Sequence, residues 1–557
     1  MNLVRTLLDS ATAVTFLSVS VCGQETLRVS IDSSGMQGDK DCLRPALSAD
    51  GMVVAFQSEA TNLVSGDTNG DWDVFVHDRN TGTTSRVSLD SSGTQADGDS
   101  FSPSISTDGR FVAFSSVAGN LVPNDKNGSS DIFVHDRLNE ITERVSVDSS
   151  GAEGNGSSGQ RSSVTGDGRI IAFESYASNL VEDDRNFDRD VFVHDCLTGI
   201  TELVSIDASG QAAAGPSQQP SVSADGQFVA FTSKAPDLVS QDLNGLEDVF
   251  VHDRVLRVTE RASVDSSGGE GNGYSMSVAL SADAACVAFS SRANNLVPGD
   301  TNGAEDVFVH IRSLKTTERV SVSSGGVQAD AHCYLPSISA DSIILVFFSG
   351  STNLVDNDTN GQEDVFFHDR SVGVTVRASV STSGAQAKWG GRTPVVSANG
   401  LVISFHSPSP DLVPDDTNER EDIFVHEICP TDASWWNYGT GFSGERGVPA
   451  FVALSEPVID SILVLQAGNS SSGFTVGILL AGLQSTLIPT CKGGDLLVIP
   501  ISTMLLALPP NGIVLSFELP GDDALCGLEL FLQILERDHE AAKGLSFTAG
   551  MALRFGY

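Results

Sequence analysis

A repeat of 58 or 59 residues runs through most of this chain of 557 residues and restricts the folds open to it. A phenylalanine that ends an apolar run recurs in seven successive units, at Phe56, Phe114, Phe173, Phe231, Phe289, Phe347 and Phe405. A second series lies in a segment whose commonest form is DVFVHD: Phe75, Phe133, Phe192, Phe250, Phe308, Phe366 and Phe424. The units lack the apolar spacing of helical solenoids. Each contains four short strand-like runs, the pattern typical of a β-propeller blade.

The phase of the repeat predicts how the propeller closes. In the fourth unit the strands are expected at residues 220–223, 228–233, 248–252 and 259–265, with a tight hairpin at Asp225-Gly226. The fourth-strand motif, RVS or a close variant, first occurs before the first complete unit and is absent after the last one. We therefore predict an all-β fold: a closed seven-bladed propeller over residues 24–430, in which an N-terminal strand at residues 27–32 completes the last blade and removes an open edge.

These motifs carry a family resemblance. The succession S-x-D-G, V-A-F-x-S, D-V-F-V-H-D and E-R-V-S resembles the WD40-like repeats of TolB-type propellers, known as PD40 repeats, over about residues 26–429. The TolB type implies six blades behind an α/β domain that engages envelope partners, and this chain departs from it with seven units and no such preceding domain. Oligogalacturonate lyases and the propellers of prolyl-oligopeptidase-like enzymes look like relatives. The G-x-S-x-G elbow of a peptidase is absent from the sequence.

The connections between strands two and three and between successive units are long, and in an up-and-down blade they share a face, where binding is expected. The former carry the motif D-x-N-x-x-x-D, whose oxygens could converge on Ca²⁺. The alternative is that they form Asx turns and only shape the loop. The fifth motif position adds a carboxylate at Asp71 and Asp188, so the first and third loops are the best calcium candidates. The seven motifs are Asp67/Asn69/Asp73, Asp125/Asn127/Asp131, Asp184/Asn186/Asp190, Asp242/Asn244/Asp248, Asp300/Asn302/Asp306, Asp358/Asn360/Asp364 and Asp416/Asn418/Asp422.

Two further side chains recur with the repeat. A histidine follows the third strand's phenylalanine in every unit (His77, His135, His194, His252, His310, His368 and His426), and an arginine opens the fourth strand in six (Arg28, Arg86, Arg144, Arg261, Arg319 and Arg377), with Leu203 in the remaining one. A residue present in every blade answers a need that every blade shares. We expect hydrogen-bonded histidines between blades, and arginines paired with repeat carboxylates.

Specificity is expected where the repeat is broken. Basic and aromatic residues interrupt the links between units at Lys388, Trp389, Arg392, His332 and Tyr334. At the mouth of a central channel these side chains could hold an acidic sugar by ion pairing and ring stacking, although sequence drift in surface loops produces similar scatter. No catalytic residue is singled out.

The two ends of the chain differ from the repeat. Residues 1–23 carry one basic residue and an apolar stretch at 13–22, which predicts a signal peptide and no membrane span. Residues 431–557 are apolar and punctuated by glycine, which predicts a β-sandwich-like domain with a helix only around residues 531–543.

Charge limits the partners. Lys+Arg number 32 and Asp+Glu 72, a net charge of −40 that disfavours nucleic acid and anionic lipid. We expect a secreted, periplasmic or cell-surface monomer that serves as a non-catalytic binding or scaffold module for protein or polysaccharide, with calcium as its one candidate cofactor. The alternative is a carbohydrate-active lyase acting on an acidic polysaccharide.

Overall fold

The computed structural model describes residues 25–182 and 184–428 and, in the C-terminal part, 434–438, 443, 448–455, 462–471, 474–482, 485–489, 495–500, 502–518, 529–537 and 545–554. The expected signal peptide lies outside the described residues. All regular structure in the described residues is β-strand, which confirms the all-β prediction. Among these residues, no helix has the length and apolar character needed to cross a membrane.

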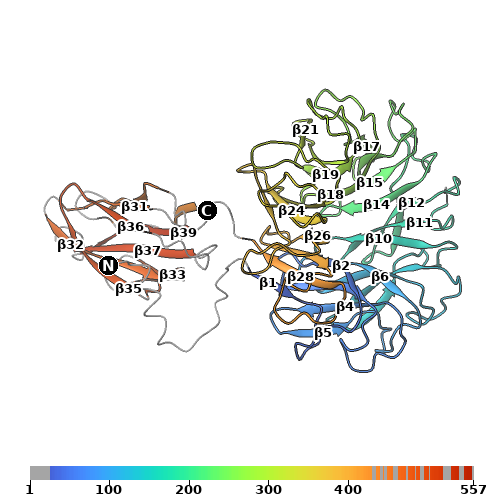
Figure 1. The fold of residues 1–557 in the computed structure, drawn as a ribbon, viewed down its shortest axis with the longest axis horizontal. Coiled ribbons are helices and arrows are strands. Elements are labelled where there is room, and N and C mark those ends of the chain that lie inside the picture. The colour runs from blue at the N-terminus through green and yellow to red at the C-terminus, as the bar shows by residue number, and fades with distance from the viewer. Residues whose placement is uncertain are drawn as a thin grey trace. The chain divides into compact units, whose positions relative to one another are not determined.

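Four-stranded antiparallel sheets follow one another along residues 25–428 and are numbered here in chain order (Figure 1). Sheets one to three contain β2 (Cys42–Leu47), β3 (Val53–Ser58), β4 (Asp73–Asp78), β5 (Thr83–Arg86); β6 (Ser100–Ile105), β7 (Phe111–Ser116), β8 (Asp131–Asp136), β9 (Ile141–Arg144); β10 (Ser158–Val164), β11 (Ile170–Ser175), β12 (Asp190–Asp195) and β13 (Ile200–Leu203). Sheets four to six contain β14 (Ser217–Val222), β15 (Phe228–Ser233), β16 (Asp248–Asp253), β17 (Val258–Arg261); β18 (Ser275–Leu280), β19 (Cys286–Ser291), β20 (Asp306–Ile311), β21 (Thr316–Arg319); β22 (Cys333–Ile338), β23 (Ile344–Ser349), β24 (Asp364–Asp369) and β25 (Val374–Arg377).

Sheet seven joins the two ends of this region. Its strands are β26 (Arg392–Val396), β27 (Val402–Ser407), β28 (Asp422–Glu427) and β1 (Thr26–Arg28), and β1 pairs with β28 in the register Leu27 to Val425. The N-terminal strand therefore supplies the fourth strand of the last sheet, as predicted. It is shorter than predicted, because regular pairing ends at the arginine in β1 as in the other fourth strands.

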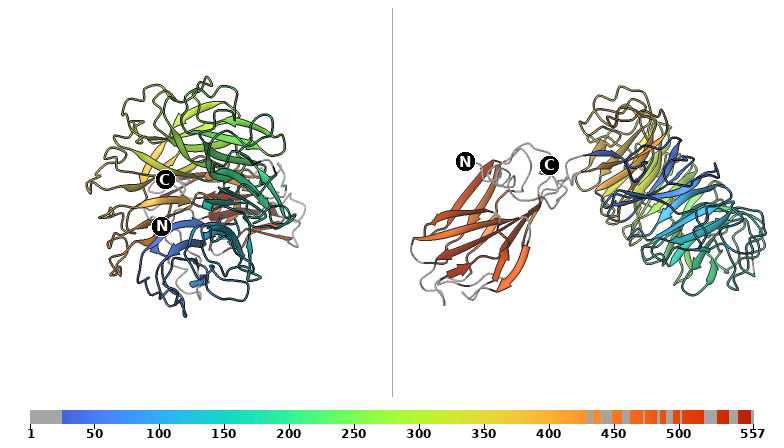
Figure 2. Two further views of the ribbon diagram at one scale, coloured as in Figure 1. Left: turned by 90° about the vertical axis from the view of Figure 1, so that its right-hand side faces the viewer. Right: turned by 90° about the horizontal axis from the view of Figure 1, so that it is seen from below.

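Neighbouring sheets pack through their first strands. Each first strand contacts those of the preceding and following sheets, and β26 contacts β2. Figure 2 shows the strands following one another around a common centre, from blue through green to orange. An N–H at the start of each first strand also donates to a carbonyl of the preceding sheet; for sheet one, Cys42 N–H donates to Glu421 O at 2.7 Å. This arrangement is that of a β-propeller.

The repeated phenylalanines form the core between sheets. In sheet one, Phe56 and Phe75 lie opposite each other in the register of β3 and β4, with ring centroids 6.0 Å apart, and both are fully buried. Their rings pack with Ile423 and Val425 of sheet seven. Because both faces of each sheet are covered, the third strands are apolar without alternation.

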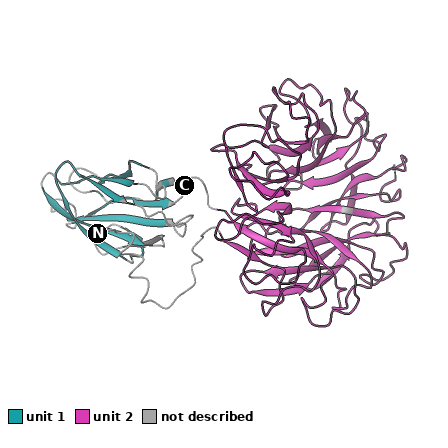
Figure 3. Cartoon of the chain, in the orientation of Figure 1, with its two compact units in different colours: residues 1–24, 429–557 teal, residues 25–428 magenta. Residues whose placement is uncertain are grey.

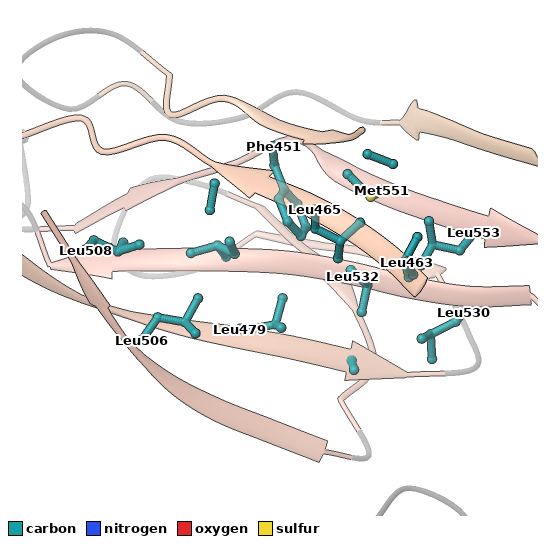
Figure 4. Close-up of a cluster of buried hydrophobic side chains, with 14 residues drawn as sticks. Phe451, Leu463, Leu465, Leu479, Leu506, Leu508, Leu530, Leu532, Met551 and Leu553 are labelled. Atoms are coloured by element: carbon teal, nitrogen blue, oxygen red, sulfur yellow. The ribbon is translucent and has the colours of Figure 1, made fainter. Parts of the chain in front are cut away.

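The C-terminal stretches belong to a second compact unit (Figure 3). A six-stranded sheet contains β29 (Ser434–Tyr438), β32 (Thr475–Gly482), β35 (Ser502–Leu508), β37 (Glu529–Arg537), β38 (Leu545–Phe547) and β39 (Gly550–Arg554). A three-stranded sheet contains β30 (Phe451–Ala453), β31 (Ile462–Ala467) and β36 (Ile513–Glu518). A two-stranded sheet contains β33 (Ser485–Pro489) and β34 (Asp495–Val498). Leucines of the six-stranded and three-stranded sheets share one buried cluster (Figure 4). This is the packing of a β-sandwich.

The helix predicted around residues 531–543 is wrong for the part that the structure describes. Residues 531–537 lie within β37, which pairs with β32 on one side and β39 on the other. Alternate side chains of this strand, Leu530, Leu532 and Ile534, enter the buried cluster. Tertiary pairing thus decides between two structures that a short apolar run fits equally well.

Candidate functional site

The long connections lie together on one side of the sheets, as predicted. In sheet one, the side chain of Asn62, after β3, donates to the carbonyl of Gln37, in the link before β2, at 2.9 Å. The N–H of Thr61 donates to Asp39 Oδ1 of the same link at 2.8 Å. This long-loop side is the part of the propeller where loops from different sheets can build a site.

An arginine occupies the centre of six of the seven D-x-N-x-x-x-D loops. In sheet one, Arg86 Nη1 lies 3.2 Å from Asp67 Oδ1 and 3.0 Å from Asp73 Oδ2. Corresponding pairs join Arg28, Arg144, Arg261, Arg319 and Arg377 to the first and last aspartates of their own loops. The prediction that these arginines pair with repeat carboxylates is confirmed.

The asparagine of each loop shapes the backbone. Asn69 Oδ1 accepts the N–H of Asp71, and its Nδ2 donates to Asp73 Oδ2 at 3.0 Å and to Ala96 O at 3.1 Å. In the other six loops the asparagine oxygen likewise accepts the N–H two residues on, and Nδ2 donates to the last aspartate at 2.7 to 2.9 Å; these residues are Asn127, Asn186, Asn244, Asn302, Asn360 and Asn418. These are the Asx turns of the alternative interpretation.

Calcium does not fit the six loops that contain arginine. The guanidinium lies between the first and last aspartates, in the place that an ion would need to take. Among the described residues, no group of three or more His, Cys, Asp and Glu side chains is arranged to hold a metal ion. Asp71 lies outside the ion pairs of Arg86, which join that arginine to Asp67 and Asp73.

The calcium assignment is therefore corrected for these six loops. Their first and last aspartates share one guanidinium, and the asparagine amide binds the last aspartate and the backbone. The residues removed from the predicted metal set are Asp67, Asn69, Asp71 and Asp73; Asp125, Asn127 and Asp131; Asp242, Asn244 and Asp248; Asp300, Asn302 and Asp306; Asp358, Asn360 and Asp364; and Asp416, Asn418 and Asp422.

Sheet three differs, because Leu203 stands in place of the arginine. Asp190 Oδ1 accepts from Ser205 Oγ at 2.6 Å, and Oδ2 accepts from Asn186 Nδ2 at 2.7 Å. Burial, with a smaller contribution from the carboxylates of Asp184 and Asp188, raises the pKa of Asp190 to about 7. Among the described residues no cation forms an ion pair with Asp184 or Asp190.

The repeated histidines are structural. Each Nδ1 lies 2.8 or 2.9 Å from the hydroxyl of a fourth-strand threonine of its own sheet, as in His77 with Thr84. The Thr84 hydroxyl donates in turn to the carbonyl of Ile31, in the preceding segment of chain. The link between sheets therefore runs through the threonine, and the prediction that the histidine itself bonds between blades is corrected accordingly.

A cavity of about 340 Å³ opens among sheets one to three on the long-loop side. It is lined by Arg44, Gln57, Phe101, Ser102, Ser115, Ser130, Ser157, Ser158, Gly159, Glu174, Tyr176 and Arg189. Arg189 lies over the ring of Tyr176, 5.6 Å from its centroid, and pairs with Glu174 at 3.3 Å. Tyr176 is 56% exposed, so its ring is available to a ligand.

Two guanidinium groups share this part of the first strands. Arg44 Nη1 donates to Ser102 Oγ at 2.6 Å. Burial and the positive charge of Arg44 lower the pKa of Arg161 in β10, and the carboxylate of Glu174 acts in the opposite direction. Neither side chain forms an ion pair with a carboxylate of the described residues. In a chain with a net charge of −40, this local excess of positive charge favours an anion.

The predicted ligand residues lie in sheets six and seven and the links before them. The rings of His332 and Tyr334 stack with centroids 5.7 Å apart, and His332 Nδ1 accepts the N–H of Glu305 at 2.8 Å. Burial raises the pKa of Tyr334, with a contribution from Glu305 and Glu363.

Lys388 Nζ lies 5.0 Å from the ring centroid of Trp389, and Arg392 Nε pairs with Glu363 Oε2 at 2.7 Å. The charge of Glu363 thus pairs with Arg392 and also contributes to the raised pKa of Tyr334. The basic groups here are already engaged, in contrast to Arg44 and Arg161.

Four glutamates, which we call the acidic arc, were not predicted from the sequence. Glu247, Glu305, Glu363 and Glu421 each precede a third strand in sheets four to seven, where sheets one to three have Trp72, Ser130 and Arg189. The backbone carbonyl of each of these residues accepts an N–H at the start of the next first strand. Alignment of the units on their DVFVHD segments reveals this set, so the signal was present in the sequence. The arc and the arginines give the long-loop side two electrostatically different halves.

The fold is that of a β-propeller with a cavity on its long-loop side. No family model and no curated protein matches the chain.

Among similar solved structures is an oligogalacturonate lyase from Vibrio parahaemolyticus, 13% identical, with a TM-score of 0.44, covering 73% of this chain and 99% of that one. Another is an oligogalacturonate lyase in complex with manganese, 12% identical, TM-score 0.45, covering 74% and 96%. A third is a putative TolB from Agrobacterium tumefaciens, 13% identical, TM-score 0.34, covering 62% and 94%. TolB is the type of propeller that the repeat resembles.

Proposed function

We propose that this protein is a non-catalytic binding module whose propeller is a closed ring of seven blades and whose ligand is an acidic saccharide. Ring closure is supported by the pairing of β1 with β28 and by the hydrogen bond from Cys42 to Glu421. A closed ring leaves only the short edges of the individual blades and gives the loops a rigid base.

The observation that carries the ligand proposal is the pair Arg44 and Arg161 beside the cavity of sheets one to three. Guanidinium groups bind carboxylates through two parallel N–H donors. Tyr176 and Phe101 offer rings against which the apolar face of a sugar can stack. A volume of about 340 Å³ lies at the small end of ligand pockets, which suits one or two sugar rings bearing a carboxylate.

The same cavity supports binding rather than catalysis. Glu174 is its one lining carboxylate, and its oxygens accept from Arg189 and from the N–H of Gln219. Because both oxygens of Glu174 are engaged by these donors, the carboxylate is poorly placed to exchange protons with a substrate. The lyase alternative is retained as an outcome of the test below.

The location and the cofactor complete the proposal. We place the protein outside the cytoplasm, as a secreted, periplasmic or surface monomer, on the basis of the apolar stretch at residues 13–22. Calcium is proposed for none of the six loops that contain arginine.

Calorimetric titration with oligosaccharides that contain uronic acid, and with their neutral counterparts, tests the ligand. We expect binding of the acidic sugars alone, with a loss of affinity of about tenfold or more in Arg44→Gln and in Tyr176→Ala. Arg110→Gln is the matched control, because Arg110 pairs with Asp136 beside the short turn before β7. Equal affinity for neutral sugars would contradict the acidic ligand, and release of an unsaturated sugar product would contradict the non-catalytic assignment.

A further inference from the structure

Sheet three has lost two side chains that fill the loop in every other sheet. The first is the fourth-strand arginine, replaced by Leu203, whose side chain packs against the apolar cluster that sheets two and three share. The second is a Gln or Glu in the link after the fourth strand, replaced by Ala212.

In the other sheets this second residue reaches into the loop. Glu270 Oε2 accepts from Arg261 Nη1 at 2.8 Å, and Gln386 Nε2 donates to Asp358 Oδ1 at 2.9 Å. Neither Leu203 nor Ala212 can make such a contact. The two replacements therefore remove both the positive charge and the polar atoms that surround the loop carboxylates elsewhere.

The carboxylates themselves are retained and buried. Asp190 is 0% exposed and Asp184 is 7% exposed. Asp184 Oδ1 is inaccessible to solvent and has no hydrogen-bond partner among the described residues. In the other sheets the corresponding aspartate lies 3.2 to 3.6 Å from a guanidinium nitrogen. In its charged form a buried carboxylate without an ion pair is costly, so the loop of sheet three favours a proton or a cation in the place that a guanidinium takes in the other sheets.

We propose that sheet three binds one divalent cation of the calcium class between Asp184 and Asp190, in the place that a guanidinium takes in the other six sheets. Carboxylate oxygens are the ligands that Ca²⁺ prefers, and its coordination sphere tolerates irregular geometry. Since two carboxylates are too few for a full sphere, water and other loop oxygens complete it. The site is distinct from the saccharide cavity and does not depend on the proposed function.

Calorimetric titration of the full chain with CaCl₂, after treatment with chelator, tests the site. We expect one calcium per chain, with a Kd on the order of 10⁻⁴ to 10⁻³ M, the range of extracellular calcium modules. Thermal unfolding of the propeller should shift upward by about 2–4 °C at saturating CaCl₂.

Three variants distinguish this site from general binding to an acidic surface. Asp184→Asn removes a ligand, and Leu203→Arg restores the guanidinium of the other sheets, so both should abolish the calorimetric signal and the thermal shift. Asp300→Asn makes the same change in sheet five, where Arg319 fills the loop, and should leave both unchanged. The proposal is overturned if the unmodified chain binds no calcium, or if Asp184→Asn binds it as well as Asp300→Asn does. Because Asp184→Asn is nearly isosteric, it keeps the test decisive should Leu203→Arg fail to fold.

Discussion

Hydrogen-bond donors fix the protonation of the repeated histidines. In sheet seven the Thr26 hydroxyl donates its single proton to Val380 O at 2.5 Å, so its oxygen must accept from His426 Nδ1–H at 2.9 Å. Burial lowers the pKa of all seven repeated histidines, and that of His426 to about 4. At mildly acidic pH the folded protein therefore keeps these imidazoles neutral, whereas the unfolded chain would bind a proton at each of them.

This linkage predicts acid sensitivity. Between pH 6.5 and about 4 the unfolded state binds the proton that folded His426 refuses, so the free energy of unfolding falls as the pH falls. His426→Asn, whose amide can still donate to Thr26, should remove about 2 kcal/mol of the loss between pH 8 and pH 5. Denaturant unfolding at the two pH values measures it.

The comparison with pH 8, where the imidazole is neutral in both states, separates titration from packing. Asp422 in the same strand acts in the opposite direction, because burial raises its pKa to about 6 and its protonation favours folding at low pH. That contribution is common to both proteins and cancels. An unchanged pH dependence in His426→Asn would contradict the prediction.

Backbone strain distinguishes individual repeats. The Asp-Gly turn between first and second strands places Gly226 at φ +73°, and Ala284 takes the same position at φ +54°. Left-handed backbone is costly for residues other than glycine. We expect Ala284→Gly to stabilise the protein by about 0.5–1 kcal/mol, measured by denaturant unfolding. Gly226→Ala is the reciprocal control and should destabilise, since its Cβ would lie 2.9 Å from a side-chain carbon of Ile170. A loss of stability in Ala284→Gly would show that the alanine methyl contributes more by packing than the backbone loses.

At the scale of elements, β1 joins the two ends of the propeller. In addition to the backbone pairing of β1 with β28, Arg28 forms ion pairs with Asp416 and Asp422. Ser30 Oγ donates to Asp422 Oδ1 at 2.5 Å. Without β1, β28 becomes an exposed edge strand, and Asp422 in this strand and Asp416 in the loop before it lose their cation. Such an edge promotes aggregation.

Deletion of residues 25–32 should therefore destabilise sheet seven before any other sheet. Hydrogen exchange of the deleted protein should show loss of protection in β26 to β28, together with a lower overall midpoint of unfolding. Arg28→Leu is the milder companion variant, since it removes the ion pairs and leaves the backbone pairing. Unchanged exchange in β28 would mean that the strand contributes little to closure.

At the scale of the molecule, the sequence predicts what repeats and little of what does not. A fixed period predicts the paired phenylalanines, the arginine–aspartate contacts and the closing strand, because the same residue pattern recurs from unit to unit. Arg44 and Arg161 belong to different sheets, and only packing of the first strands brings them together. The strand at 531–537 shows the same limit, because its partners lie far away in the chain.

Net charge determines how the thermal stability of the whole chain depends on salt. With 72 acidic and 32 basic residues, the exposed carboxylates repel one another in the folded state, while the arginine–aspartate pairs are buried and weakly screened. Raising NaCl from about 0.02 to about 0.3 M, with chelator present, should therefore raise the midpoint of thermal unfolding. The chelator ensures that the effect is screening rather than occupation of the loop in sheet three, and Leu203→Arg should respond to NaCl as the unmodified chain does. A midpoint that falls with salt would mean that attraction between charges outweighs their repulsion.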